Sequence, residues 1–138
     1  MEPQHRDKLL ARVQTLEADH QSILHSVYSA VAHGRFDEFA GLVTEDVELH
    51  ITGMAPMDGV WRGRDAVVAA TRKNFAMVDA QQPQIENMIA QGNMVAVLLN
   101  ERGTFREDGR AYSVRVVQWF TFSGGKISRM DEICAPWR

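Results

Sequence analysis

The sequence has little of three things: cysteine, long apolar runs and charge of one sign. Its single cysteine, Cys134, excludes a disulfide within the chain and is typical of a reducing compartment. No apolar run approaches the roughly 18 residues that a membrane-spanning helix needs. The N-terminus is too polar for a signal peptide. We therefore expect a cytoplasmic protein that has no membrane partner.

The charge balance argues against nucleic acid as a partner. Fifteen Lys and Arg stand against 18 Asp and Glu, which gives a net charge of -3 without any basic stripe. Metal-ligand motifs are also weak, because there is no HExxH segment and no cysteine pair. Glu48 and His50 share one strand face with Asp58 nearby, which is a poor signal. We expect no metal and no cofactor.

What the sequence does contain is typical of a globular domain. Its 138 residues are 45% hydrophobic and 24% charged. A chain of this size buries roughly two thirds of its unfolded surface, which is enough for one core. We expect a single domain over residues 1–138, in which residues 1–20 form a helical extension.

The first half of the chain has mainly helical periodicity. Apolar residues recur at spacings of three and four over 5–33, which predicts a helix, although the polar residues 17–20 could also be a break. A short helix is expected over 36–43. A third is expected over 65–77, after the turn at 53–59. Between them, 46–52 alternates apolar and polar residues as a strand does.

The second half reads as strands joined by turns. Strands are predicted over 84–90, 94–106, 111–122 and 127–133, separated by turns that contain Gly92, Gly109 and Gly124. Helices that come first and an antiparallel meander that comes last predict an α+β fold.

The order and wording of three segments resemble a known family. VYSAVAHGRFDEFAGLVTEDVELHITG, GVWRGRDAV and WFTFSGGKISRMDEI are similar to the SnoaL-like branch of the nuclear transport factor 2-like superfamily, over residues 20–134. That superfamily includes ketosteroid isomerases, polyketide cyclases and limonene epoxide hydrolases. The resemblance implies a cystatin-like cone, in which a strongly bent antiparallel sheet packs against three helices in the order α-α-β-β-α-β-β-β-β. It also implies a pocket for a small hydrophobic ligand and a homodimer through the outer sheet face.

The resemblance to ketosteroid isomerases is incomplete at the residues that carry their chemistry. Tyr28 lies near the position of their oxyanion-binding tyrosine, although a core tyrosine with a satisfied hydroxyl would look the same. Ile51 stands where they keep the base, and it cannot take a proton. Gln118 stands where they keep a protonated aspartate, and it donates a hydrogen bond without titrating. Isomerisation by that mechanism is therefore disfavoured.

The resemblance to limonene epoxide hydrolases points to other residues. Arg102 matches their arginine, Thr104 replaces one of their aspartates, and Glu132 matches the other carboxylate. An arginine beside Glu132 would hold that carboxylate ionised and orient it. A structural ion pair between neighbouring strands is the alternative.

Alternation along the strands then sorts the candidates into faces. If Arg102 points inward, so do Leu98, Asn100 and Thr104. If Gln118 points inward, so do Val114, Val116, Phe120 and Phe122 of its strand, and if Glu132 points inward, so do Met130 and Cys134 of the last strand. Tyr112, Arg115, Val117, Trp119 and Thr121 are then expected outward, where a second copy would cover the apolar ones.

His50 remains open at this point. Strict alternation points it away from Leu49 and Ile51, unless a bulge near Gly53 turns it inward toward Trp61. There it would serve as a base or an anchor, whereas a surface histidine is the simpler interpretation. The other histidines, His5, His20, His25 and His33, are expected to be solvated on the first helix.

These residues predict a small-molecule pocket that carries cofactor-free acid–base chemistry of the isomerase, cyclase or hydrolase type. Glu132 is the expected base, and Arg102, His50 and Tyr28 are its expected helpers. The expected ligand contacts are Trp61, Asn100, Thr104, Gln118, Phe120 and Met130. Two alternatives are a non-catalytic ligand-binding protein and a dimeric protein-interaction module that uses Arg115, Val117 and Trp119.

Overall fold

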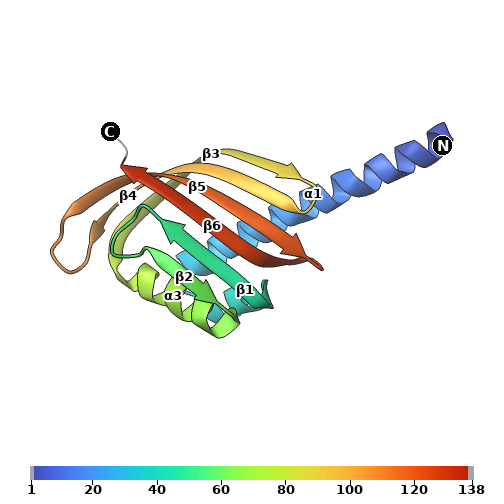
Figure 1. Ribbon diagram of the computed structural model, residues 1–138. Coiled ribbons are helices and arrows are strands. Elements are labelled where there is room, and N and C mark those ends of the chain that lie inside the picture. The colour runs from blue at the N-terminus through green and yellow to red at the C-terminus, as the bar shows by residue number, and fades with distance from the viewer. Residues whose placement is uncertain (1, 137–138) are drawn as a thin grey trace.

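The computed structural model describes residues 2–136, over which the chain forms three helices and six strands (Figure 1). The elements are α1 (Pro3–Ala32), α2 (Phe36–Ala40), β1 (Val43–Thr52), β2 (Gly59–Arg62), α3 (Arg64–Ala76), β3 (Val78–Gln91), β4 (Met94–Phe105), β5 (Ala111–Ser123) and β6 (Lys126–Pro136). The predicted α+β class and the predicted order of elements are confirmed. Among the described residues, no helix is both long and apolar enough to cross a membrane.

The strands form one curved sheet in the order β2-β1-β6-β5-β4-β3. Neighbouring strands are antiparallel except β1 and β6, which are parallel, so the sheet is mixed rather than wholly antiparallel as predicted. Register shifts interrupt β1 against β6 and β3 against β4, and such bulges bend a sheet. Figure 1 shows the bent sheet curving over α3 and the C-terminal half of α1.

Strand β3 is longer than the sequence predicts. It begins at Val78 instead of residue 84 and runs past Pro83. Proline lacks the N–H that a central strand needs, but β3 lies at the edge of the sheet, where one side needs no partner. The long strand β4 supplies the pairing for these additional residues.

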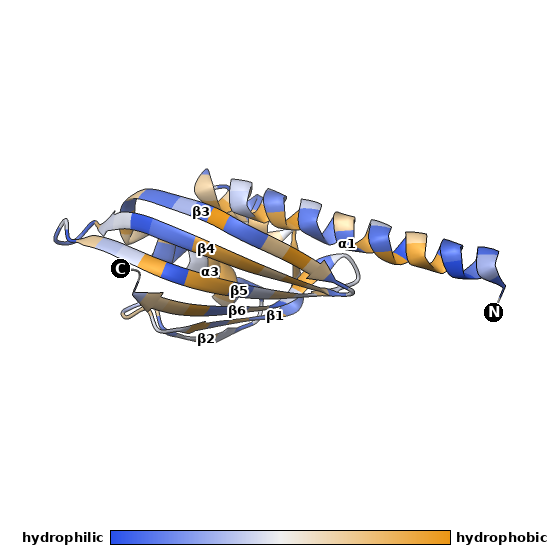
Figure 2. Ribbon diagram, turned by 90° about the horizontal axis from the view of Figure 1, so that it is seen from above, coloured by the Kyte–Doolittle hydropathy of each residue, from blue (hydrophilic) through white to orange (hydrophobic). Residues whose placement is uncertain are grey.

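Helix α1 is continuous through the polar residues 17–20, so this stretch is part of the helix and not a break. Leu24, Val27 and Ala30 of its second half are buried against the sheet. The first half projects beyond the sheet, as both ribbon views show (Figures 1 and 2). Its exposed large apolar residues are Leu9, Leu10, Val13 and Leu16.

His20 is buried, so the prediction that it is solvated is wrong. Only 3% of His20 is exposed, and its ring stacks on Phe122 with centroids 4.1 Å apart. Its Nδ1 lies 3.1 Å from the carbonyl oxygen of Gly92, whose N–H donates to Glu17 Oε2 at 3.2 Å. The β3–β4 turn therefore closes over this part of α1 and fixes the helix to the end of the sheet.

The core lies between the concave face of the sheet and the helices. On β5 the predicted inward residues Val116, Phe120 and Phe122 are buried, as expected. On β4 the predicted inward face, which contains Leu98 and Arg102, is wrong by one residue. The residues that pack into the core are Val95, Val97 and Leu99. The segment MVAVLLN is apolar on both faces, so alternation alone does not choose between them.

Candidate functional site

A cavity of about 490 Å³ lies between the inner face of the sheet, the C-terminal half of α1, and α3. Its wall is mainly apolar. The larger apolar contributors include Phe39, Leu49, Ile51, Phe75, Leu99 and Phe120. A few polar groups enter this wall from α1, β4, β5 and β6, which is the usual composition of a small-molecule site.

Glu132 is the centre of the polar part of the cavity. It lies on β6, opposite Gln118 of β5 and Ile51 of β1, with all three side chains lining the cavity. Gln118 Nε2 donates to Glu132 Oε1 at 3.1 Å, and the hydroxyl of Tyr28 donates to Gln118 Oε1. Because the amide oxygen of Gln118 accepts the hydrogen bond from Tyr28, its amide nitrogen faces Glu132. A relay of two hydrogen bonds thus runs from α1 through β5 to β6.

The surroundings of Glu132 bring its ionisation close to neutral pH. Burial raises the pKa of Glu132 to about 7; the hydrogen bond from Gln118 lowers it and the negative charge of Glu101 raises it further, both to a smaller extent. A carboxyl with such a pKa is present in both protonation states at neutral pH, which suits proton transfer. Burial also raises the pKa of Tyr28, so its hydroxyl stays protonated as a donor.

Glu101 is a second carboxyl in the same cavity, and the sequence analysis missed it. Its Oε2 accepts a hydrogen bond from the hydroxyl of Tyr112 at 2.8 Å, and its Oε1 accepts one from Gln81 Nε2 at 2.9 Å. Burial raises the pKa of Glu101, while these two hydrogen bonds lower it. Alternation from the buried Val97 and Leu99 would have turned Glu101 inward. Tyr112, which was expected outward, donates to this inward carboxyl.

Cys134 is the next inward position on β6 after Glu132 and also lines the cavity. Burial, followed by the charge of Glu132, raises the pKa of its thiol to about 12, so it stays protonated and is a poor nucleophile. The backbone of Gly53 passes close by, with a φ of +85°. A Cβ at Gly53 would lie 2.1 Å from the carbonyl oxygen of Cys134, so only glycine fits there.

Five of the predicted site residues come together in this cavity. They are Tyr28, Gln118, Phe120, Met130 and Glu132, contributed by α1, β5 and β6. The resemblance to ketosteroid isomerases and limonene epoxide hydrolases singles out Gln118 and Glu132, and both side chains line the cavity.

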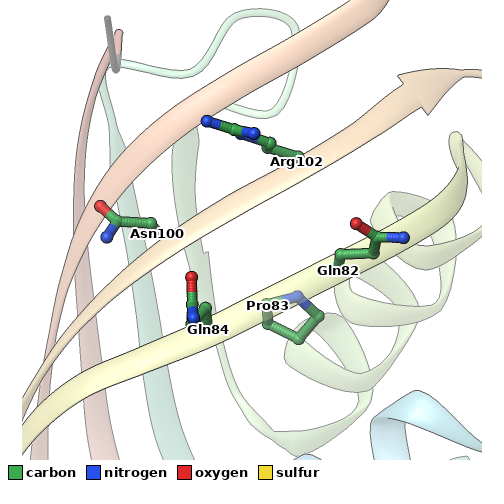
Figure 3. A pocket seen from close by; sticks show the side chains of 5 residues that line it. All are labelled: Gln82, Pro83, Gln84, Asn100 and Arg102. Carbon is green, nitrogen blue, oxygen red and sulfur yellow. The ribbon is translucent and has the colours of Figure 1, made fainter.

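Arg102 and Asn100 lie on the opposite, outer face of the sheet, so the predicted pairing of Arg102 with Glu132 is wrong. With Gln82, Pro83 and Gln84 they line a separate outer depression of about 570 Å³ (Figure 3). The cause is the one-residue error on β4, since successive side chains of a strand point to opposite faces.

Asn100 and Thr104, which were predicted to contact the ligand, form their hydrogen bonds outside the cavity. Asn100 Nδ2 donates to Glu86 Oε1. The hydroxyl of Thr104, two residues past Arg102, donates to the backbone oxygen of Asp79 at 3.4 Å. Neither Asn100 nor Thr104 belongs to the wall of the cavity.

His50 and Trp61 are also outside the cavity. His50 has Nε2 3.4 Å from Glu48 Oε1 and sits opposite Asp131, while its neighbours Leu49 and Ile51 point inward. The register of β1 against β6 is regular from residue 48 to 52, so no bulge turns His50 inward. Trp61 packs against the core from β2.

Residues 2–136 contain no group of three or more His, Cys, Asp or Glu side chains arranged to hold a metal ion. The hydrogen bonds to the two cavity carboxyls and their partners come instead from two amides, those of Gln81 and Gln118, and from the hydroxyls of Tyr28 and Tyr112.

A bent sheet that covers helices and encloses an apolar cavity defines a cone-shaped α+β protein. The chain belongs to the family described as SnoaL-like domain, whose model matches residues 24–130. The resemblance seen in the sequence is thereby confirmed. A curated relative, the uncharacterized protein Rv0034 of Mycobacterium tuberculosis, is 28% identical over 116 residues, or 82% of this chain and 86% of the relative.

Solved structures share the fold at low sequence identity. An NTF2-like protein from Burkholderia xenovorans LB400 is 21% identical with a TM-score of 0.76, covering 86% of this chain and 91% of that one. An LEH-like epoxide hydrolase of M. tuberculosis is 14% identical with a TM-score of 0.71, covering 86% of this chain and 84% of that one. At these identities the likeness establishes the fold and leaves the chemistry to the residues of the cavity.

Proposed function

We propose that this protein is a cofactor-free acid–base enzyme that acts on a small apolar molecule, with Glu132 as the group that transfers the proton. The observation that carries the proposal is the carboxyl of Glu132 inside an apolar cavity, with a pKa of about 7 and a fixed hydrogen bond from Gln118. Such a carboxyl takes up and returns a proton at neutral pH without help from another group.

The reaction that best fits one such carboxyl is movement of a proton within the substrate. Ionised Glu132 removes a proton from a carbon beside a carbonyl group, and the electron pair of that C–H bond shifts toward the carbonyl oxygen. The neutral carboxyl of Glu132 then returns the proton to another carbon, so atoms and charge balance. The relay through Gln118 and Tyr28 keeps the carboxyl in place during both steps.

Hydrolysis of an epoxide is a second candidate, and Glu101 is the observation that favours it. In that reaction ionised Glu132 would take a proton from water as the water oxygen bonds to an epoxide carbon. Glu101, whose pKa is also raised, would donate a proton to the epoxide oxygen as its bond to that carbon breaks. The fold shared with an LEH-like epoxide hydrolase supports keeping this candidate.

The proposal is tested by the conversion of 3-cyclohexenone to its conjugated isomer in deuterated water, followed by ultraviolet absorbance and NMR. We expect enzyme-dependent isomerisation whose rate rises with pH through about 7, and a loss of at least about 100-fold in Glu132→Gln. Glu107→Gln, which removes an exposed carboxylate in the β4–β5 turn, should behave as wild type.

Other outcomes separate the alternatives. If the ketone is untouched but styrene oxide is opened with incorporation of oxygen from labelled water, and Glu101→Gln abolishes this, the hydrolase is correct. If the wild type converts neither substrate while small apolar molecules still bind, and Glu132→Gln binds them as tightly, the protein is a ligand-binding protein and the acid–base proposal fails. If Glu132→Gln turns over the ketone as fast as an active wild type, Glu132 is not the base.

We also propose that a second copy of the chain covers the outer sheet face. The exposed apolar residues of β3, β5 and β6 there are Ile89, Val117, Trp119 and Ile133. On the same face, two buried polar atoms, Asn100 Oδ1 and Ser113 Oγ, lack a hydrogen-bond partner among the described residues. A closed dimer would remove the apolar surface from water and could supply the missing partners.

A further inference from the structure

The charges that line the cavity are of one sign. Among its described lining residues there is no Lys or Arg, and the acidic side chains are Glu101 and Glu132. Among these described lining residues, His33 at the end of α1 is the one that carries a titratable nitrogen. It is exposed, and its Nδ1 lies 2.8 Å from the carbonyl oxygen of Ser29. An anionic ligand would therefore meet two acids and no fixed positive charge.

The two carboxyls are also incompletely satisfied by the protein. Glu132 Oε1 accepts one hydrogen bond, and no described residue donates to its Oε2. Glu101 accepts one neutral hydrogen bond on each oxygen. Neither carboxyl forms an ion pair with any residue in 2–136. A carboxylate has about four acceptor positions, so both groups retain capacity for a donor that the ligand brings.

We propose that the ligand of this cavity is a small apolar molecule that carries one protonated amine, whose ammonium group pairs with Glu132 while Glu101 contributes a second negative charge. The apolar wall formed by residues such as Phe39, Leu99 and Phe120 takes the hydrocarbon part. An ammonium group in such a low-dielectric site gains more from a carboxylate than it would in water. This ligand class names a substrate for the proposed acid–base function, but its binding does not require turnover.

Ligand binding should be coupled to proton release. Without a cation, burial favours the neutral forms of Glu132 and Glu101, whereas an ammonium group favours the ionised forms. The pKa values of Tyr28 and Cys134, the other titratable groups beside Glu132, are raised, so these stay protonated. Asp58, in the loop between β1 and β2, accepts hydrogen bonds from the backbone of residues 53 and 54.

The test compares three ligands of one shape and different charge: adamantylamine, adamantanol and adamantane carboxylate. Isothermal titration calorimetry is run from about pH 5.5 to about pH 8.5, in two buffers that differ in ionisation enthalpy. We expect the amine to bind at least about tenfold more tightly than the alcohol at the upper end of this range, with proton release, and the carboxylate to bind more weakly than either.

Variants assign this preference to the carboxyls. In Glu132→Gln the amine should lose its advantage over the alcohol, while the alcohol binds as in wild type and so reports an intact cavity. Glu101→Gln should reduce the advantage by a smaller factor. Glu107→Gln controls for net charge and His25→Gln for loss of an exposed histidine outside the cavity, and both should retain the preference.

The proposal is overturned if the amine shows no measurable binding, if the alcohol or the carboxylate binds as tightly, or if the preference survives in Glu132→Gln. Its failure is distinct from failure of the proposed function, because the isomerisation assay uses a neutral ketone. Ketone turnover without amine preference would refute the ligand class alone. Amine preference without any turnover would refute the enzyme alone.

Discussion

Ionisation of Glu132 lowers the free energy of unfolding of the protein. The pKa of Glu132 rises from an ordinary 4.5 to about 7, mainly because burial disfavours the charged form. Between these two values the folded protein binds more protons than the unfolded chain does. The stability contributed by this group is therefore highest below about pH 4.5, and it is lost as the pH rises to about 7.

This difference predicts how stability depends on pH. The free energy of unfolding of the wild type should fall by about 3 kcal/mol between about pH 5 and about pH 8 through Glu132 alone. Glu132→Gln has the same shape and no charge, so its decline should be smaller by about this amount. Urea unfolding at a series of pH values measures both proteins. Parallel profiles for the two would show that Glu132 is ionised without penalty in the fold.

Tyr28 acts on Glu132 through Gln118, so we regard it as a positioning residue. Tyr28→Phe removes the hydroxyl that fixes the amide of Gln118. The amide is then free to turn its oxygen toward Glu132, which removes the hydrogen bond that lowers the pKa of Glu132.

We therefore expect the midpoint of the pH–rate profile for ketone isomerisation to move to higher pH in Tyr28→Phe, with a rate about tenfold lower at neutral pH. The free energy of unfolding should fall by about 1–3 kcal/mol, because a buried acceptor loses its donor. A lower rate with an unchanged midpoint would mean that Tyr28 has a packing role only.

Among the elements, α1 holds the sheet in its bent form. Its second half packs on the concave face, and the buried His20 fixes the turn between β3 and β4 through Phe122 and Gly92. This contact joins residues separated by 72 positions in the sequence, and the periodicity of the helix alone gives no sign of it.

His20→Ala should lower the free energy of unfolding by about 2–3 kcal/mol, because it removes a stacked ring and leaves the Gly92 carbonyl without its partner. His25→Ala is the matched control, since His25 is exposed on the same helix and should change stability by less than about 0.5 kcal/mol. Chemical unfolding of the two variants decides the matter. Equal effects would show that His20 adds nothing beyond helix propensity.

At the scale of the whole molecule, the bent sheet has two faces with different roles. The concave face encloses the cavity, and the outer face exposes Trp119, Val117 and Ile133. Because successive residues of β5 alternate between these faces, a substitution on the outer face should leave the cavity unchanged.

Trp119→Glu should convert a dimer into a monomer, as measured by sedimentation equilibrium, because it places a charge in the centre of the proposed interface. Binding of adamantanol in the cavity should change less than about twofold. Ser123→Glu, at the exposed end of the same strand, is the control and should remain dimeric. A wild-type protein that is monomeric at all concentrations would refute the proposed dimer.

Much of the fold and part of the site were open to prediction. Gln118 and Glu132 are singled out by the resemblance, whereas alternation alone leaves their direction open, because β5 and β6 also carry apolar residues on the outer face. The direction of β4 was predicted wrongly, because both of its faces are apolar, and the error exchanged Glu101 for Arg102. His50 points away from the cavity, as strict alternation predicts, because β1 has no bulge against β6 between residues 48 and 52.

The sequence by itself determined the order of helices and strands, because local periodicity and turn residues are encoded over short stretches. The resemblance of three of its segments indicated the family and, through it, the candidates Tyr28, Gln118 and Glu132. Only the tertiary structure decided that β1 pairs in parallel with β6, that Glu101 joins Glu132, and that burial raises the pKa of Glu132 to about 7. The pairing and the burial depend on contacts between segments far apart in the chain. The pKa of a carboxyl such as Glu132 depends on how far those contacts exclude water from it.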